Sequence, residues 1–225
     1  MDKLRLVYAQ TGRARWISHL DAMRTLQRGL LRAGVPLRYS EGFNPHAYLM
    51  FPLALSLGCE SSCEILDFRI DGDMSPEEAV QRLNAVLPED LQFLHVAEPV
   101  HKHTDIAFAD YAVKLRAAEP CTPEQLRALW DAFFAQEKIL IEKKTKRGST
   151  MLDLKEQVAH CESETAADGI TLSLRLPAGT SVNVNPSLLL DAFTAYLTEH
   201  APETKLLFPQ TERLAILCAD GSAFT

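Results

Sequence analysis

Apolar and polar residues along the first third of the chain follow the periods of strands and helices. Leu4 to Ala9 alternates weakly and predicts a strand. Ser18 is a typical N-cap, and Asp21 three positions later completes a capping box, so we expect a helix to about Ala33. The apolar positions that should face the core from this helix are Leu20, Met23, Leu26, Leu30 and Leu31.

The next segments predict a hairpin, a second helix and a closing strand. The expected elements are strands over 49–57 and 63–70, a helix starting at Ser75-Pro76, and a strand over 91–96. The order strand, helix, strand, strand, helix, strand is that of a ferredoxin-like (split βαβ) domain. Residues 98–104, with a proline and two histidines, have the composition of a linker.

The second half repeats this order less cleanly. We expect strands over 111–115 and 139–142, a helix over 122–136, a pair of strands over 152–160 and 170–176, a helix over 185–199, and a last strand over either 205–208 or 214–218. The fold prediction is therefore α+β, with two tandem ferredoxin-like units and antiparallel sheets. The predicted domains are residues 1–98 and 105–225.

The charge is distributed unevenly along the chain. The net charge of the 225 residues is −7, but residues 1–47 hold eight Lys or Arg against three acidic residues, a local charge of +5. The remainder holds 15 basic and 27 acidic residues, a charge of −12. This asymmetry favours an anionic partner for the N-terminal part, or it reflects only a solvated basic helix face.

Composition and motifs exclude several classes of protein. No apolar run approaches the length of a membrane span, and the N-terminus carries no charged-then-apolar leader, so we expect a cytoplasmic protein without a membrane partner. The five cysteines are odd in number and suit free thiols in a reducing compartment. Cys59 and Cys63 lack the third cysteine of a radical-SAM cluster, and no glycine-rich phosphate loop is present. We expect no metal site and no cofactor.

Two dense polar motifs stand out, Arg15-Trp16-Ile17-Ser18-His19-Leu20-Asp21 and Tyr39-Ser40-Glu41-Gly42-Phe43-Asn44-Pro45-His46. They flank one helix, so they can come together in space. The sequence Ser18-His19-x-Asp21 invites a catalytic-triad interpretation, but triad residues usually come from separate segments, and a helix cap already explains Ser18 and Asp21. His19 and His46 have no such explanation. They could bind an anion, act as general acid and base, or share a metal.

The same motifs suit RNA. Phe43 or Tyr39 could stack on a base, arginines could hold phosphates, and Asn44 and His46 could bond base edges or a 2′-hydroxyl. A second basic loop, 143–148, supports this hypothesis if it lies on the same side; otherwise it is an exposed hairpin tip. The candidate RNA-binding residues are Arg13, Arg15, Trp16, His19, Arg24, Arg28, Arg32, Tyr39, Ser40, Phe43, Asn44, His46, Tyr48, Lys144, Lys146 and Arg147.

At segments 17–21, 31–34 and 39–46, which read ISHLD, LRAG and YSEGFNPH, the chain closely resembles the uncharacterised bacterial family of radical-SAM-associated (radical-SAM-linked) proteins. In that family the domain is often fused to, or encoded beside, a radical S-adenosylmethionine (radical-SAM) protein with a cobalamin-binding-type region. The resemblance covers most of the chain and is specific in the first 70 residues. Ala47 and Tyr48 depart from it, since the family usually carries proline and lysine there.

The resemblance implies a radical-SAM protein as partner, and the motifs suggest RNA. We therefore expect an accessory protein that binds tRNA or rRNA, presents it to the radical-SAM partner, and has no catalytic activity of its own. Two alternatives stay open. One is a metal-independent endoribonuclease with His19 and His46 as acid and base, and the other is a protein-docking module that binds no RNA.

Overall fold

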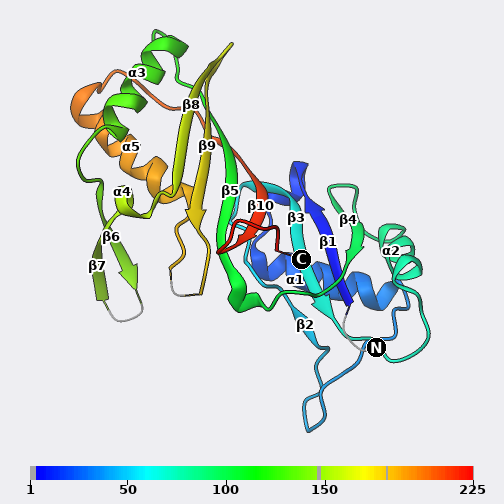
Figure 1. Cartoon of the computed structure of the whole chain (residues 1–225). Helices are drawn as coiled ribbons and strands as arrows, with labels where there is room; N and C mark the ends of the chain where they lie inside the picture. The colour runs from blue at the N-terminus through cyan, green and yellow to red at the C-terminus, as the bar shows by residue number, and fades with distance from the viewer. Residues whose placement is uncertain (1–3, 146–147, 181, 225) are drawn as a thin grey trace. The chain divides into compact units, whose positions relative to one another are not determined.

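The computed structural model describes residues 4–145, 148–180 and 182–224, and the chain forms two compact units (Figure 1). Unit 1 comprises Met1–Ile106 together with Ser222–Thr225, and unit 2 comprises Ala107–Gly221. Both units combine helices with a mainly antiparallel sheet, so the prediction of an α+β fold is confirmed at that level.

Unit 1 contains the elements β1 (Leu4–Gln10), η1 (Gly12–Trp16), α1 (His19–Arg32), β2 (Leu49–Met50), β3 (Cys59–Phe68), α2 (Pro76–Asn84), β4 (Leu91–Ala97) and η2 (His103–Asp105). Its sheet has the order β4-β1-β3, with the short β2 paired to β3, and all these pairs are antiparallel. The pairing Leu6↔Leu66 fixes the register of β1 on β3.

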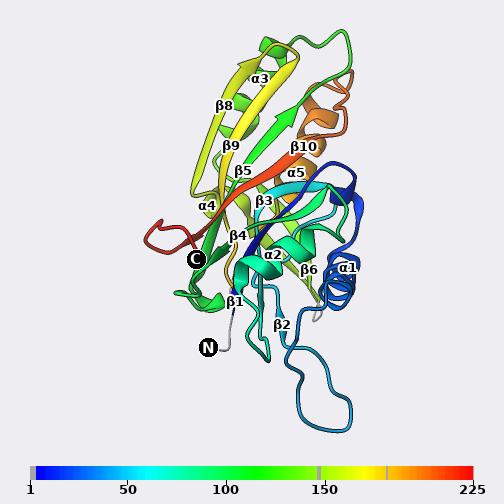
Figure 2. The ribbon, with the colours of Figure 1, turned by 90° about the vertical axis from the view of Figure 1, so that its right-hand side faces the viewer.

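The core of unit 1 lies between this sheet and its two helices. Alternate residues of β1 and β3 point toward α1 and α2, because successive side chains of a strand face opposite sides. The resulting cluster joins Leu6 and Leu66 to Leu30 and Leu83, and all four are fully buried. The helices therefore cover one face of the sheet, and the loop between α1 and β2 is left at the periphery of the unit (Figure 2).

Helix α1 buries only part of the expected apolar face: Leu26 and Leu30 are fully buried, and Met23 is half-buried. Leu20 and Leu31 were expected to face the core, but 61% and 53% of these side chains are exposed. Ala22 and Gly29 are buried instead. A Cβ atom at Gly29 would lie 2.7 Å from Cδ2 of Leu87, so the helix approaches its neighbour along a line of small residues.

The predicted strand over 49–57 was wrong in extent, since β2 ends at Met50. Pro52 has no backbone N–H to donate to a ladder, which explains why the pairing stops there. Its partner strand begins at Cys59, earlier than the expected residue 63. Gly58, at φ 82°, makes the turn into β3 and donates its N–H to the carbonyl of Arg15 at 2.7 Å.

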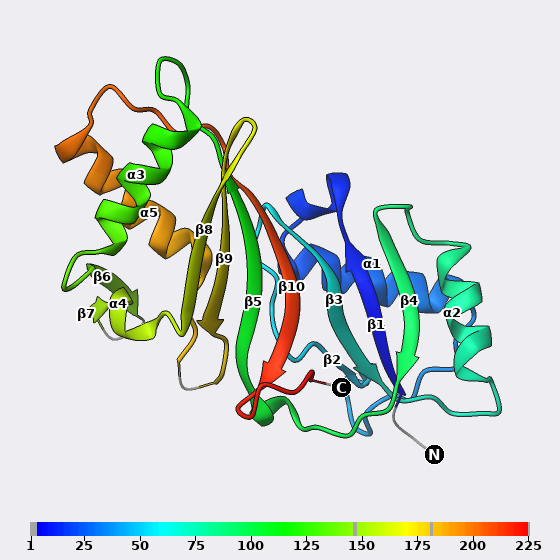
Figure 3. The same ribbon diagram turned by 45° about the horizontal axis from the view of Figure 1, so that its top comes forward.

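Unit 2 contains β5 (Ile106–Leu115), α3 (Pro123–Phe134), β6 (Leu140–Thr145), β7 (Gly148–Asp153), α4 (Leu154–Gln157), β8 (His160–Ala166), β9 (Gly169–Pro177), α5 (Pro186–His200) and β10 (Gln210–Cys218). The strand order is β10-β5-β9-β8, and β6 and β7 form a separate two-stranded sheet. Helices α3 and α5 lie together on one face of the larger sheet (Figure 3). Between them lie the rings of Trp130, Phe133 and Phe193.

The predicted strand over 152–160 was wrong. Strand β7 ends at Asp153, whose carboxylate oxygen Oδ1 accepts hydrogen bonds from the backbone N–H groups of Ile139 and Lys155, both at 3.0 Å. This capping bond starts the short helix α4 where the apolar pattern had suggested a continuing strand. The strand that precedes β9 and pairs with it across a tight turn is β8.

Candidate functional site

The second polar motif forms a closed hairpin between α1 and β2. Tyr39 and Ala47 make an isolated antiparallel bridge, and the Ser40 N–H donates to the carbonyl of His46 at 2.9 Å. The Ser40 hydroxyl oxygen accepts from the His46 N–H at 3.1 Å and lies 2.9 Å from its Nδ1. The carbonyl of Asn44 lies 3.5 Å from the same Nδ1. The motif therefore specifies the neck of a loop that projects from unit 1 (Figure 1).

Phe43 occupies the tip of this hairpin. Its side chain is fully exposed, with a relative accessibility of 111%, whereas an apolar ring of this size normally buries most of its surface. Gly42 supports the tip, since its φ of 124° is one that other residues rarely adopt. The ring is thus held away from the core by a loop whose neck is hydrogen-bonded, which leaves both of its faces available for stacking.

Two tyrosines flank the neck of the hairpin, Tyr39 before the tip and Tyr48 after it. Tyr39 and Tyr48 are each 42% exposed, and the ring of His46 lies 6.3 Å from that of Tyr48. The guanidinium carbon of Arg69 lies 5.3 Å from the centre of the Tyr48 ring, within the range of a cation–π contact. Sequence analysis missed Arg69, because only the β2–β3 register, Leu49 opposite Phe68, brings it beside Tyr48.

Three arginines spaced four residues apart form a stripe along α1. Arg24, Arg28 and Arg32 are all exposed, on the side of α1 turned away from the core. Arg32 donates from Nη2 to the carbonyl of Val86 at 3.3 Å, and Arg24 lies 3.3 Å from the carboxylate of Asp21. The stripe therefore offers cationic groups to a partner on one outer surface of unit 1.

Ser18 caps α1, but the bonds differ from those of the expected capping box. Its hydroxyl oxygen accepts from the Asp21 N–H at 3.1 Å, and the hydroxyl donates to Oδ2 of Asp21 at 2.7 Å. This bond, helped by the nearby charge of Arg24, lowers the pKa of the Asp21 carboxyl below its usual value. These contacts explain Ser18 and Asp21 as structural residues.

We expect Ser18→Ala to raise the pKa of Asp21 toward its ordinary value, because the variant loses the hydroxyl that bonds the carboxylate. A folded-state pKa below the unfolded value means that the ionised form stabilises the helix start above that unfolded pKa. This stabilisation is lost as the pH falls through the folded-state pKa. An NMR titration of the carboxyl carbon measures the shift, and Ser75→Ala, which removes the equivalent cap of α2, should leave Asp21 unchanged.

The arginines of η1 already contact acidic residues from other elements. Arg15 lies 3.1 Å from Glu60, and its guanidinium carbon is 4.9 Å from the centre of the Trp16 ring. Arg13 is almost fully exposed, and its Nε lies 3.8 Å from Asp90. Trp16 is 47% exposed. Arg13 and Arg15 therefore carry less uncompensated positive charge than the sequence suggested.

The two candidate catalytic histidines belong to different groups of contacts. His19 meets Phe51 edge to face, with ring centres 5.8 Å apart, whereas His46 belongs to the neck of the hairpin with Ser40. These contacts fix the position of each imidazole. In unit 2, Lys144 lies in β6, and the structure describes its backbone but not its side chain. Lys146 and Arg147 lie outside the described residues.

Within the described part of the chain, no three His, Cys, Asp or Glu side chains gather into a group that could hold a metal ion. No described helix is both long enough and apolar enough to cross a membrane. The cysteines, Cys59, Cys63, Cys121, Cys161 and Cys218, are free thiols.

Comparisons with known proteins place the chain in a family without adding an activity. None of the curated proteins compared with it matches. Among solved structures, a putative glycine cleavage system transcriptional repressor aligns over 94% of this chain and 98% of its own, with 15% identity and a TM-score of 0.23. A likeness at that level carries no argument. A family model matches residues 3–186, so the chain belongs to the bacterial family described as "Uncharacterized protein conserved in bacteria (DUF2344)".

Proposed function

We propose that this protein binds single-stranded or looped RNA through unit 1 and presents it to a radical-SAM partner. The observation that carries the proposal is the exposed ring of Phe43 on a hydrogen-bonded hairpin. Exposed arginines on α1 of the same unit add the charge that a nucleic acid requires. The aromatic group would stack on a base, and the arginines would hold phosphates.

The arrangement suits unpaired RNA better than a duplex. An unpaired base offers both faces to a ring and its edges to hydrogen-bonding groups, whereas a paired base is already stacked on both sides. Tyr39, Tyr48 and His46 lie along the neck of the hairpin, where neighbouring nucleotides could stack or bond. The RNA class we propose is a tRNA or rRNA with an accessible loop.

The topology supports the proposed fold class for both units. In unit 1 the chain order β1-α1-β2-β3-α2-β4 and the strand order β4-β1-β3-β2 are those expected of a ferredoxin-like domain. Unit 2 has the same pattern in β5-α3-β8-β9-α5-β10 if β6, β7 and α4 are treated as an insertion. We propose that both are ferredoxin-like.

The radical-SAM partner rests on the resemblance of the polar motifs to the radical-SAM-associated proteins. Co-purification from cells that express the tagged chain tests this part separately from RNA binding. Crosslinking and sequencing of the RNA retained by the same preparation would name the substrate. If no RNA is enriched in the untreated preparation and a radical-SAM protein still co-purifies after nuclease treatment, the protein-docking module is favoured instead.

We expect Phe43→Ala to weaken binding of a fluorescent RNA hairpin by about 5- to 150-fold, because one base–aromatic stack contributes about 1–3 kcal/mol. Replacing Arg24, Arg28 and Arg32 together with alanine should weaken binding and flatten its dependence on salt. Each lost phosphate contact removes about 0.7 from the logarithmic salt slope for single-stranded RNA. Fluorescence anisotropy over a range of salt concentrations measures both effects.

Arg127→Ala provides the matched control, since Arg127 is an exposed helix arginine of unit 2 paired with Asp131. It removes one helix arginine, against three in the triple variant, and leaves unit 1 unchanged, so its affinity and salt slope should equal those of the wild type. The proposal is wrong if the wild-type protein binds no RNA at low salt. It is equally wrong if Phe43→Ala and the arginine triple variant both bind like the control.

A further inference from the structure

Unit 1 contains a cavity beside the neck of the hairpin, on β2 and the end of β3. Its volume is about 280 Å³. The residues that line it are Tyr48, Leu49, Met50, Asp67, Phe68 and Arg69. Because β2 directly follows the hairpin, Tyr48 is only five positions from Phe43, and an extended chain of that length spans at most about 18 Å (Figure 1). The cavity and the tip of the hairpin therefore belong to the same part of unit 1.

The register of β2 on β3 brings a ring and a guanidinium group to one point of this cavity. Leu49 lies opposite Phe68, and both pack in the core of unit 1. Successive side chains of a strand point to opposite faces, so Tyr48 and Arg69 lie together on the face turned away from that core. The guanidinium carbon of Arg69 lies 5.3 Å from the centre of the Tyr48 ring.

The lining of the cavity carries one uncompensated positive charge. The carboxylate of Asp67 already accepts two hydrogen bonds from the guanidinium of Arg5, at 2.7 and 2.8 Å. Arg69 is exposed, and among the described residues its guanidinium contacts the Tyr48 ring rather than a carboxylate. The cavity therefore offers a positive charge beside an aromatic ring, the pair of groups that a nucleotide requires.

Backbone hydrogen bonds hold this wall of the cavity in place. The Tyr48 N–H donates to the carbonyl of Arg38 at 3.1 Å, and the Arg38 N–H donates to the carbonyl of Arg69 at 2.9 Å. A wall formed before the ligand arrives reduces the ordering cost of binding. Tyr48 is 42% exposed, so a flat apolar ligand would cover surface that is now open to water.

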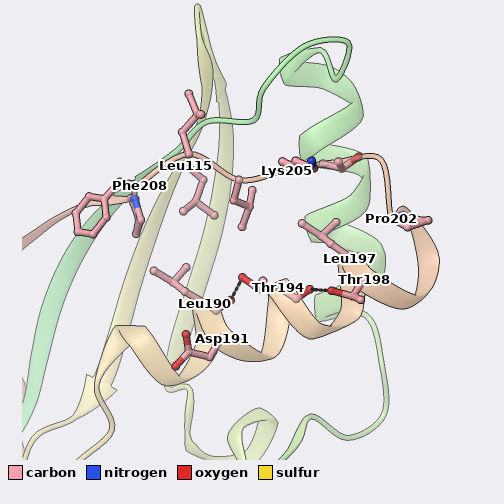
Figure 4. A pocket seen from close by; sticks show the side chains of 13 residues that line it. Leu115, Leu190, Asp191, Thr194, Leu197, Thr198, Pro202, Lys205 and Phe208 are labelled. Carbon is pink, nitrogen blue, oxygen red and sulfur yellow. Dashed lines mark hydrogen bonds between the residues drawn. The ribbon is translucent and has the colours of Figure 1, made fainter.

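A larger groove in unit 2 lacks this combination of groups. It lies between α5 and the segment that leads from α5 to β10, and its volume is about 570 Å³ (Figure 4). The Thr194 hydroxyl donates to the carbonyl of Leu190 and the Thr198 hydroxyl to that of Thr194, so both hydrogens are used within α5. No arginine lines this groove, and its two charged side chains, Asp191 and Lys205, come from opposite walls.

We propose that the cavity beside the hairpin binds one nucleotide of the RNA. Its base stacks on the exposed part of the Tyr48 ring, beside the thioether of Met50, and its phosphate meets Arg69. Stacking accepts any base, since every base has a π face, and a guanidinium group suits a phosphate. The inference rests on the proposed function. It adds a second stacking position to that of Phe43 and a phosphate contact outside α1.

The test is a titration of the full chain with AMP and CMP, followed by the methyl NMR signal of Met50. Ribose 5-phosphate is the probe that lacks a base. We expect the signal to shift and saturate with both nucleotides, and ribose 5-phosphate to bind at least about 5-fold more weakly, because it cannot stack. The methyl signal of Met151, which is exposed in β7 of unit 2, should stay unchanged.

Substitutions in the wall should separate the two contacts. Tyr48→Leu should weaken nucleotide binding by about 5- to 150-fold, whereas Tyr48→Phe keeps the ring and should bind like the wild type. Arg69→Met should weaken it by at least about 10-fold, because a hydrogen bond between charged groups is lost. Arg82→Met is the matched control, since Arg82 is an exposed helix arginine of unit 1 paired with Glu78, and it should change nothing.

The fluorescent RNA hairpin distinguishes failure of this inference from failure of the proposed function. If the wild type binds the hairpin but Tyr48→Leu binds it as tightly as Tyr48→Phe, or if nucleotides leave the Met50 signal unchanged, the cavity is not a nucleotide site and RNA binding stands. If the wild type binds no RNA, both proposals are wrong. Weaker binding of the hairpin by Tyr48→Leu, together with a nucleotide-induced shift of Met50, supports the inference.

Discussion

Replacing Asp67 with asparagine will lower the free energy of unfolding by about 3–5 kcal/mol, because it leaves a buried guanidinium without its counter-charge. Arg5 and Asp67 lie opposite each other on β1 and β3 and are joined by two bonds, Nε to Oδ1 at 2.7 Å and Nη2 to Oδ2 at 2.8 Å. Their side chains are 0% and 2% exposed. Urea denaturation of the variant and the wild type measures the loss.

The surroundings of Arg5 offer little compensation for the lost carboxylate. Nη2 also donates to the carbonyl of His101 at 3.2 Å, and the ring of Phe224 lies 4.6 Å from the guanidinium carbon. Nη1 is buried and has no hydrogen-bond partner among the described residues. Neither a single carbonyl nor a ring can replace a full negative charge in a site closed to water.

Unit 2 provides a control with the same geometry and a different environment. Arg175 and Asp110 are joined by the same two bonds at 2.7 and 2.8 Å, but their side chains are 40% and 28% exposed. Asp110→Asn should therefore cost only about 0.2–1 kcal/mol, since water screens the pair and solvates the remaining charge. Equal losses in the two variants would show that burial does not determine the effect.

The Arg5–Asp67 pair also shows where the charge pattern of the sequence was misleading. Arg5, Arg13 and Arg15 contribute to the excess of positive charge in residues 1–47, but each contacts an acidic residue from beyond that segment. Such pairing depends on which strands become neighbours, and no local pattern reveals it. The exposed stripe of Arg24, Arg28 and Arg32, in contrast, follows from their spacing of four residues, because helical periodicity is a local property.

Helix starts were also predictable, because an N-cap is a local feature of the sequence. Ser18, Ser75 and Thr122 all accept a hydrogen bond from the N–H three residues later, as their sequence context indicated. Strand extents were harder, as Pro52 and Asp153 show. The exposure of Phe43 could not be predicted either, since an aromatic residue beside a turn can equally well enter a core.

The second large effect is expected in unit 2, where Trp130→Ala should lower the free energy of unfolding by about 3–5 kcal/mol. Trp130 is 1% exposed and stands at the centre of the aromatic core between α3 and α5. Its ring centre lies 5.0 Å from that of Phe193, edge to face, and 5.5 Å from that of Phe133. Helix α5 begins 52 positions after α3 ends, and two elements so far apart in the sequence could collapse only partly into the space left by the indole.

The alkylation rate of Cys161 provides a local readout of the Trp130→Ala substitution. Burial raises the pKa of its thiol to about 11, although a hydrogen bond from Trp130 partly opposes the shift. At pH 8 very little thiolate is present, so alkylation by iodoacetamide should be much slower than for an ordinary thiol. Loss of the indole opens the site to water and reagent, and alkylation of Cys161 should accelerate in Trp130→Ala.

Trp16→Ala is the matched control for this substitution, because Trp16 is 47% exposed in unit 1. It removes the same side chain, yet it should change the free energy of unfolding by less than about 1 kcal/mol and leave the alkylation of Cys161 as slow as in the wild type. Thermal denaturation and mass spectrometry of the alkylated protein measure the two effects. A stable Trp130→Ala protein with an unreactive Cys161 would mean that α3 and α5 are held together by contacts other than this indole.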